Sequence, residues 1–193
     1  MSTLAPKLVI IRGIPGGGKS FLALSLQKAL GNDNVVILDP DAIDKESDGY
    51  KQLSAQLSAD GVDQKFHPFR YLRALAHDAI QSGKTLLWTK AFNDFAGFKI
   101  TVDKLVMFAQ EQGLELPVLV VEVEISRAVA RARIDERVHR GGHEVPDERL
   151  DQFFAEYTSF AGKGYQVVTV DGEFDASVSA ERVLAALKHT STL

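Results

Sequence analysis

The sequence predicts an α/β fold in which a five-stranded parallel sheet lies between two layers of helices. Short apolar, β-branched runs alternate along the chain with longer helical patterns, which is typical of repeated βα units. The runs are apolar almost throughout, as expected for strands that are covered on both faces. They lie at residues 7–12, 35–39, 85–89, 117–125 and 166–170. These observations together predict a three-layer sandwich.

The helices between these strands follow from apolar residues at helical spacing. They are expected over residues 20–30, 68–83, 98–112, 126–140, 147–158 and 177–188. The apolar faces expected of the first two helices are Leu22, Leu26 and Ala29, and Phe69, Leu72, Ala76 and Ala79. The polar segment 44–65 is expected to be helical in part and is a candidate for a mobile flap.

Composition limits the class of protein. The chain has 193 residues, of which 45% are hydrophobic, and this length fits a single domain over residues 1–193. It contains no cysteine, which excludes disulfides and thiolate metal sites and suits a reducing cytoplasm. We see no signal-peptide pattern and no apolar run long enough to cross a membrane, so we expect a cytoplasmic protein. The net charge of -4 argues against broad nucleic-acid binding.

A phosphate-binding motif follows the first strand. Residues 13–20 read GIPGGGKS and are followed by an amphipathic helix, so they match the P-loop pattern G-x-x-x-x-G-K-[ST] in its strand–loop–helix context. The alternative is a glycine-rich turn that fits the pattern by chance. Backbone N–H groups of the loop and the start of the helix would hold the phosphates of ATP. Lys19 would add a point charge, and the Ser20 hydroxyl would coordinate Mg²⁺. The nucleotide-binding residues expected here are Gly13, Pro15, Gly16, Gly17, Gly18, Lys19 and Ser20.

Two carboxylates follow the second strand. Asp39 and Asp41 flank Pro40, and Asp-Pro-Asp is also ordinary turn chemistry. In an open α/β sheet the ligand lies beyond the carboxyl ends of the strands, so both side chains are expected to face the P-loop. One would accept the proton of an attacking hydroxyl and the other would hold Mg²⁺ through water. We favour Asp41 as the base and Asp39 as the metal ligand, with both at the substrate.

Polar residues after the third strand are further candidates. Thr89, Lys90 and Asn93 are expected to border the substrate because they follow a strand of the same sheet. Lys90 would bind an anionic acceptor or would be a solvated loop lysine. Trp88 is expected to pack in the core.

Arginines gather on one predicted helix. Arg133, Arg137 and Arg140 fall on one helical face, and we find no carboxylate at matching spacing to relieve their repulsion. Arg131 is expected to pair with Asp135. The pair of glycines at 141–142 then permits a mobile loop, so residues 137–149 are predicted to form a lid that closes arginines over the nucleotide. The alternative is a solvated basic helix face.

The motifs together resemble the zeta-toxin and polynucleotide-kinase-like P-loop kinases. The resemblance rests on GIPGGGKS, on the strand ending in DPD, and on RV-HR-GGH-E-VP at residues 137–146. It implies ATP-dependent phosphorylation of a hydroxyl, with Asp41 as base, Lys19 and Ser20 on phosphate and metal, and Arg137 as a lid arginine. Phe21 stands where a hydroxyl residue is usual, at a nucleotide-binding position. The resemblance also raises an antitoxin-type protein partner, which the sequence does not identify.

The sequence therefore predicts a P-loop kinase that uses ATP and Mg²⁺ to phosphorylate a small molecule. The catalytic residues expected are Lys19, Asp41 and Arg137, with Arg133 and Arg140 also on the nucleotide. One alternative is a 5′-polynucleotide kinase, against which the acidic net charge weighs. Another is a nucleotide-dependent switch that performs no transfer.

Overall fold

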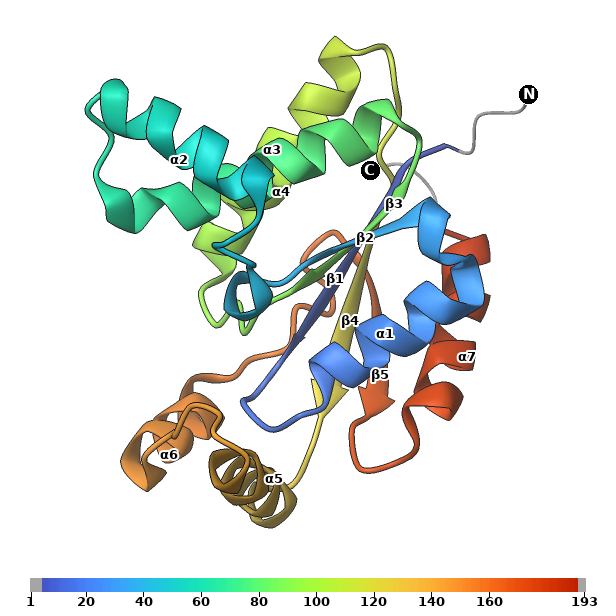
Figure 1. Ribbon diagram of the computed structural model, residues 1–193. Coiled ribbons are helices and arrows are strands. Elements are labelled where there is room, and N and C mark those ends of the chain that lie inside the picture. Colours follow the sequence, from blue (N-terminus) through green and yellow to red (C-terminus); the bar gives the residue numbers. More distant parts are fainter. Residues whose placement is uncertain (1–4, 191–193) are drawn as a thin grey trace.

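The computed structural model describes residues 5–190 and has the predicted α/β architecture (Figure 1). All strand pairs are parallel, in the order β2-β3-β1-β4-β5. The strands are β1 (Lys7–Gly13), β2 (Val35–Leu38), β3 (Thr85–Thr89), β4 (Val118–Glu124) and β5 (Gln166–Asp171). The predicted fold class is confirmed, and the P-loop strand β1 occupies the centre of the sheet.

Helices cover both faces of the sheet. They are α1 (Lys19–Leu30), α2 (Asp48–Ala59), α3 (His67–Gln81), α4 (Phe95–Glu111), α5 (Arg127–His139), α6 (Asp147–Glu156) and α7 (Ala176–Lys188). Short 3₁₀ turns lie at η1 (Asn32–Asn34), η2 (Pro40–Ala42) and η3 (Gln64–Phe66). Because side chains alternate along a strand, Leu8 and Ile10 of β1 pack with α3 and α4, whereas Val9 and Ile11 pack with α1 and α7.

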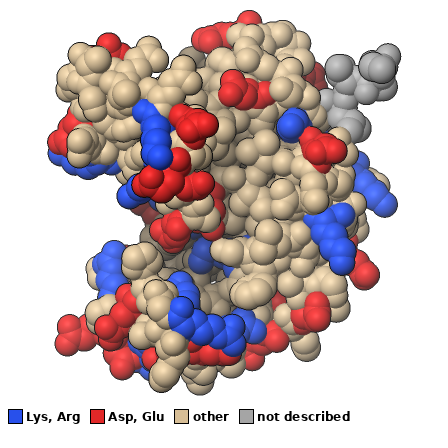
Figure 2. All heavy atoms as spheres, in the orientation of Figure 1, with Lys and Arg blue, Asp and Glu red and all other residues tan. Residues whose placement is uncertain are grey.

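A smaller apolar cluster joins α5 and α6 to the P-loop. Ile14 of the loop packs with Ala130, Ile134 and Leu150, all of which are buried. On the surface, Arg127 of α5 forms ion pairs with two aspartates of α6. The two helices therefore project together beyond the carboxyl ends of the strands, opposite α2 and α3 (Figure 1). Figure 2 shows that the surface is hollowed between these two projections.

The structure corrects three details of the predicted helices. Helix α4 begins three residues before the predicted start, because the carboxylate of Asp94 accepts hydrogen bonds from the N–H groups of Ala96 and Gly97, at 3.0 and 2.9 Å. Ala29 is exposed rather than part of the apolar face of α1. Phe69 is 51% exposed, so it does not belong to the buried face of α3, whereas Leu72 does.

The segment 44–65 contains α2 and the start of η3, so its prediction as partly helical is confirmed. Its movement as a flap stays a prediction. Within residues 5–190, no helix combines the length and the apolar character needed to cross a membrane.

Candidate active site at the carboxyl ends of the strands

The P-loop has backbone geometry that only glycine supplies without strain. Gly16 and Gly18 have φ angles of +83° and +85°, in the left-handed region. A Cβ atom on Gly16 would lie 2.7 Å from the carbonyl oxygen of Ala130, because α5 packs directly on the loop. Helix α1 begins at Lys19, and Gly18 offers no capping side chain. The N–H groups of its first turn are therefore available to an anion.

Lys19 lies inside the curve of this loop. Its ammonium group donates hydrogen bonds to the carbonyl oxygens of Gly13 and Ile14, at 3.0 and 2.9 Å. Desolvation by burial lowers the pKa of Lys19 to about 8. Phosphate oxygens bound beside Lys19 would favour its charged form and raise this pKa.

Charged residues from two distant segments act on Lys19. The carboxylates of Asp39 and Asp41, after β2, raise the pKa of Lys19 by their charge, and the guanidinium of Arg137 on α5 lowers it. Asp39, Asp41 and Arg137 therefore lie near enough to Lys19 for their charges to shift its pKa. Their roles in catalysis stay a prediction.

The two aspartates have different surroundings. Asp39 Oδ2 accepts a hydrogen bond from the hydroxyl of Ser20 at 3.2 Å, and Asp39 Oδ1 accepts one from the backbone N–H of Asp41 at 3.0 Å. Asp39 is thus fixed by the turn it caps. Asp41 is exposed, and its carboxylate accepts no hydrogen bond within the described chain. The turn chemistry and the expected roles are compatible, since the turn leaves one carboxylate fixed and the other free.

Ser20 and Asp39 fit a Mg²⁺ ion. A hydroxyl and a carboxylate oxygen are ligands that Mg²⁺ accepts, and the ion usually completes its shell with water and substrate phosphates. Residues 5–190 contain no group of three or more His, Asp or Glu side chains that would form a protein-only metal site. The donor set therefore suits a metal that arrives with a nucleotide.

The residues after β3 divide into buried and accessible ones. Thr89 is 3% exposed, and its hydroxyl has no hydrogen-bond partner among the described residues. Lys90 is exposed, and its ammonium lies 5.5 Å from the ring centre of Phe69 and 5.3 Å from that of Phe92. Asn93 is half-buried. Trp88 is buried, which confirms its prediction as a core residue.

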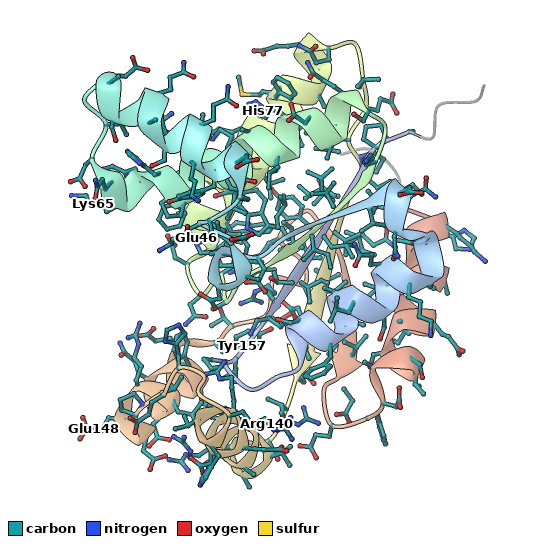
Figure 3. All side chains as sticks on the ribbon, viewed as in Figure 1. Glu46, Lys65, His77, Arg140, Glu148 and Tyr157 are labelled. Atoms are coloured by element: carbon teal, nitrogen blue, oxygen red, sulfur yellow. The ribbon has the colours of Figure 1, made fainter. Side chains whose placement is uncertain are left out.

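The three arginines predicted on the nucleotide have different partners. Arg133 donates to the carbonyl oxygen of Gly172 at 2.6 Å, next to the P-loop, and Arg137 donates to that of His143 at 2.8 Å. Arg140 forms an ion pair with Glu136, one turn earlier on α5. The prediction that this face lacks a matching carboxylate is therefore wrong for Arg140. Figure 3 shows Arg140 on the α5 side of the molecule.

Arg131 does more than pair with Asp135. That pair is confirmed at 2.6 Å, but Arg131 also donates to the carbonyl oxygen of Val145 at 2.6 Å and lies 3.6 Å from Asp147. Arg131 therefore ties α5 to the loop that leads into α6. Closure of residues 137–149 as a lid stays a prediction.

The remaining predicted nucleotide-binding residues lie around the loop. Gly17 is buried, Pro15 is half-buried, and Phe21 is 72% exposed at the start of α1. The exposure of Phe21 follows from its position on the outer face of the helix, away from Leu22 and the core.

A buried ion pair beneath the P-loop was not predicted. Arg12, the residue before the loop, pairs with Glu122 of β4, and the two side chains are 0% and 1% exposed. Arg12 also donates to the carbonyl oxygens of Thr158 and Phe92, at 2.9 and 3.2 Å, and its guanidinium lies 3.6 Å from the ring centre of Phe160. The pair therefore connects β1 to the segments after β3 and after α6.

Glu122 has partners of its own. Its carboxylate accepts hydrogen bonds from the hydroxyl of Ser159 at 2.6 Å and from the backbone N–H of Phe160 at 2.7 Å. The signal in the sequence was an acidic residue, Glu122, between Val121 and Val123 in the apolar part of the strand. A charge at such a position requires a buried partner.

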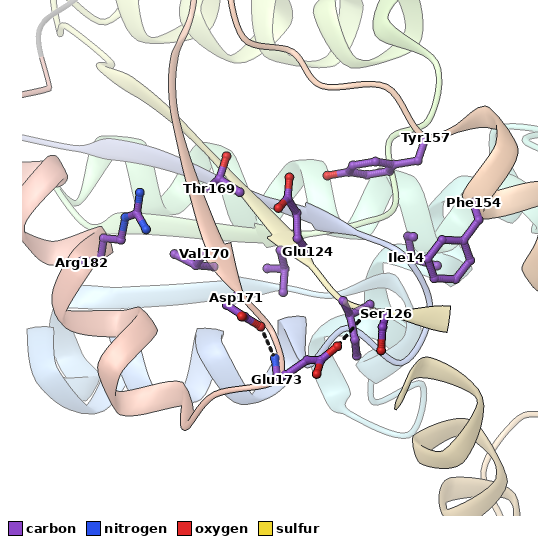
Figure 4. A pocket seen from close by; sticks show the side chains of 12 residues that line it. Ile14, Glu124, Ser126, Phe154, Tyr157, Thr169, Val170, Asp171, Glu173 and Arg182 are labelled. Atoms are coloured by element: carbon purple, nitrogen blue, oxygen red, sulfur yellow. Dashed lines mark hydrogen bonds between the residues drawn. The ribbon is translucent and has the colours of Figure 1, made fainter. Parts of the chain in front are cut away.

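A cavity of about 600 Å³ lies on the β4–β5 side (Figure 4). It borders Ile14 of the P-loop but contains neither Lys19 nor the two aspartates. In Figure 4 the ring of Tyr157 lies across the cavity near Glu124. Burial raises the pKa of Tyr157, whose hydroxyl has no hydrogen-bond partner among the described residues. The cavity is therefore separate from the cluster around Lys19.

The similarities to known proteins concern the family and the fold. The family described as AAA domain (AAA_33) matches residues 8–160. No curated protein sequence matches the chain. A solved putative kinase from Chloroflexus aurantiacus is 20% identical, with 99% of this chain and 100% of that chain covered and a TM-score of 0.63.

Two further solved structures are similar. A gluconokinase from Sinorhizobium meliloti is 19% identical, with 96% of this chain and 94% of that chain covered and a TM-score of 0.56. A deoxyadenosine kinase from M. mycoides is 16% identical, with 94% and 98% covered and a TM-score of 0.52. At these identities the likeness shows the fold, which is that of P-loop kinases.

Proposed function

The chain belongs to the AAA_33 family of AAA domains, and from this premise and the site geometry we propose that it is an ATP-dependent kinase. It transfers the γ-phosphate of ATP to a hydroxyl group of a small molecule, with Mg²⁺ as the metal. The observation that carries this proposal is the contact between the P-loop and the acidic turn: the hydroxyl of Ser20 donates a hydrogen bond to Asp39 Oδ2 at 3.2 Å, and the exposed carboxylate of Asp41 lies in the same turn. A switch protein needs the phosphate loop, but it has no need of a free carboxylate beside it.

The donor side of the site binds ATP. The N–H groups at the start of α1 hold the phosphates, and the ammonium of Lys19 exchanges its two carbonyl contacts for phosphate oxygens. Ser20 and Asp39 hold Mg²⁺, which neutralises charge on the phosphates when it is bound. Arg137, Arg133 and Arg140 reach the nucleotide from α5 when residues 137–149 close as a lid. Pro15 and Phe21 border it.

The acceptor side supplies the nucleophile. Asp41 takes the proton of the acceptor hydroxyl as that oxygen forms a bond to the γ-phosphorus, and the bond from this phosphorus to the bridging oxygen breaks, releasing ADP. A carboxylate held by no other group is suited to this task. Thr89, Lys90 and Asn93 border the acceptor, with the accessible Lys90 nearest to solvent. The RV-HR-GGH-E-VP motif supports a zeta-toxin-like kinase.

The proposal is tested by following the phosphate. The purified protein is incubated with γ-labelled ATP, Mg²⁺ and fractionated metabolites, and labelled products are identified by mass spectrometry. We expect a labelled small molecule that depends on the protein. Hydrolysis to free phosphate alone would indicate a switch, and label on the 5′ end of an oligonucleotide would indicate a polynucleotide kinase.

The matched variants are Lys19→Ala and Lys28→Ala, which lie on the same helix. Lys19 meets charge that develops on the transferring group, so its removal should abolish turnover while the fold is kept. Lys28 is an exposed residue in the last turn of α1, and its replacement should leave turnover unchanged. Near-normal turnover of a folded Lys19→Ala protein would refute the P-loop as the active site.

A further inference from the structure

An aromatic and basic groove lies on α3. Phe66, Phe69, Arg70 and Arg73 line a hollow of about 400 Å³. Phe66 and Phe69 are 49% and 51% exposed, although phenylalanine is usually buried. The four residues share one face of the helix and its entry, because they are spaced by three or four positions. This face turns away from the core, which α3 meets through Leu72.

The cations at the groove form no ion pair with a carboxylate of the described residues. Arg70 and Arg73 form no ion pair within residues 5–190, and neither does Lys90, whose ammonium lies over Phe69. By contrast, Lys65 at the edge of the groove is paired with Asp63 (Figure 3). Three cations without an ion pair among the described residues, beside two exposed rings, form a surface that an anion with a flat ring would complete.

The groove adjoins the place of phosphate transfer. Helix α3 packs against η2, the turn that contains Asp41. Lys90 directly follows β3, and its backbone N–H donates to the carbonyl oxygen of Ile11 in β1 at 3.1 Å. Lys90 therefore connects the carboxyl ends of the strands to Phe69. Helix α3 therefore carries the groove and also contacts the turn that holds the acidic pair.

We propose that the acceptor is a small molecule that already carries a phosphate group, with its ring on Phe69 and its phosphate at Arg70, Arg73 and Lys90. This inference rests on the proposed kinase function and names the substrate class of the same site. Guanidinium groups bind phosphate through paired hydrogen bonds, and an aromatic side chain covers the flat face of a base or sugar. A neutral sugar would bring no anion to these three cations.

Binding is measured first, so that the result is independent of transfer. The protein is saturated with Mg²⁺ and a non-hydrolysable ATP analogue, which occupies the P-loop, and is titrated calorimetrically with nucleoside monophosphates, the matching nucleosides, glucose 6-phosphate and glucose. We expect each neutral compound to bind at least about 10-fold more weakly than its phosphate ester. The nucleotide and sugar arms then show which ring the groove accepts.

Variants of the groove residues test whether the preference for phosphate esters arises in the groove. Arg70→Gln and Arg73→Gln should each weaken binding of the phosphate ester by about 10-fold or more and leave binding of the neutral compound and of the ATP analogue unchanged. Phe69→Ala should weaken binding of the ester and the neutral compound alike. Lys104→Gln, which removes an exposed charge from α4, is the control and should change nothing.

Equal affinity for esters and neutral compounds would overturn the inference, as would full ester binding by the double variant R70Q/R73Q. Tight binding of a 5′-hydroxyl oligonucleotide, with none of the small esters, would also overturn it. A different result would contradict the proposed kinase function. If esters bind through Arg70 and Arg73 but no labelled phosphate reaches any acceptor, the groove is a binding site and the kinase proposal is wrong.

Discussion

The phosphate loop and the proposed acceptor side of the site are built differently. The phosphate loop is one continuous segment, residues 13–20, in which glycines, a lysine and a serine are neighbours in the chain. The proposed acceptor side is assembled from the turn after β2, the end of β3 and one face of α3. The first is fixed by local geometry, and the second depends on tertiary packing. A chain can therefore keep its nucleotide chemistry while its acceptor changes with a few side chains.

The first way to sharpen this comparison is Arg137→Ala, which should have the largest effect on turnover after Lys19→Ala. Arg137 lies on α5, and its charge lowers the pKa of Lys19. In the proposed mechanism it would stabilise the negative charge that develops on the phosphoryl group during transfer. Loss of such an arginine costs about 10³–10⁵-fold in related phosphoryl transfers. We expect turnover to fall far more than affinity for ATP, as measured by single-turnover kinetics and calorimetry.

Arg140→Ala is the comparison on the same face of α5. Its guanidinium is already paired with Glu136, so it should lose less turnover than Arg137→Ala. An equal loss of turnover in both variants would mean that the arginines on this face act only through their summed positive charge. Full activity of Arg137→Ala would leave α5 as a solvated basic helix.

The buried ion pair offers a test through stability. Glu122→Gln removes the charge that balances Arg12 beneath the P-loop, and breaking a buried pair costs about 3–5 kcal/mol in the free energy of unfolding. Glu124→Gln, two residues along the same strand but exposed, is the matched control. Urea unfolding should separate the two variants clearly. Identical midpoints would show that the pair contributes nothing to the joint between β1 and β4.

The smallest expected effect is a pH dependence. Because the pKa of Lys19 is lowered to about 8 in the free protein, its ammonium is mostly charged below this pH and mostly neutral above it. Bound phosphates favour the charged form, so affinity for ATP should fall about 10-fold between about pH 7 and pH 9, with proton uptake on binding. Titration calorimetry in two buffers with different ionisation enthalpies measures both the affinity for ATP and the number of protons taken up. Lys19→Ala should lack this fall in affinity. An identical fall in that variant would show that another group titrates in this pH range.

The sequence predicted the donor side better than the acceptor side, for physical reasons. The P-loop and the Asp39–Asp41 turn are local patterns, and the structure brings them together as expected. Phe69 was expected in the core because it fits the helical apolar period, but α3 presents that position to solvent. The partners of Arg12 lie far away in the chain, so no local pattern revealed that pair. Arg131 likewise appeared to have one partner because its contact with Val145 depends on the path of a loop.

The central claim is that Asp41 serves the acceptor while the P-loop holds ATP, and Asp41→Asn tests it most directly. The amide keeps shape but cannot take a proton, so single-turnover transfer from labelled ATP should fall about 10²–10⁴-fold. Affinity for the Mg²⁺ complex of a non-hydrolysable ATP analogue should be unchanged. Asp33→Asn, an exposed aspartate before β2, is the control. If Asp39→Asn abolishes transfer while Asp41→Asn retains it, the assignment of base and metal ligand is contradicted.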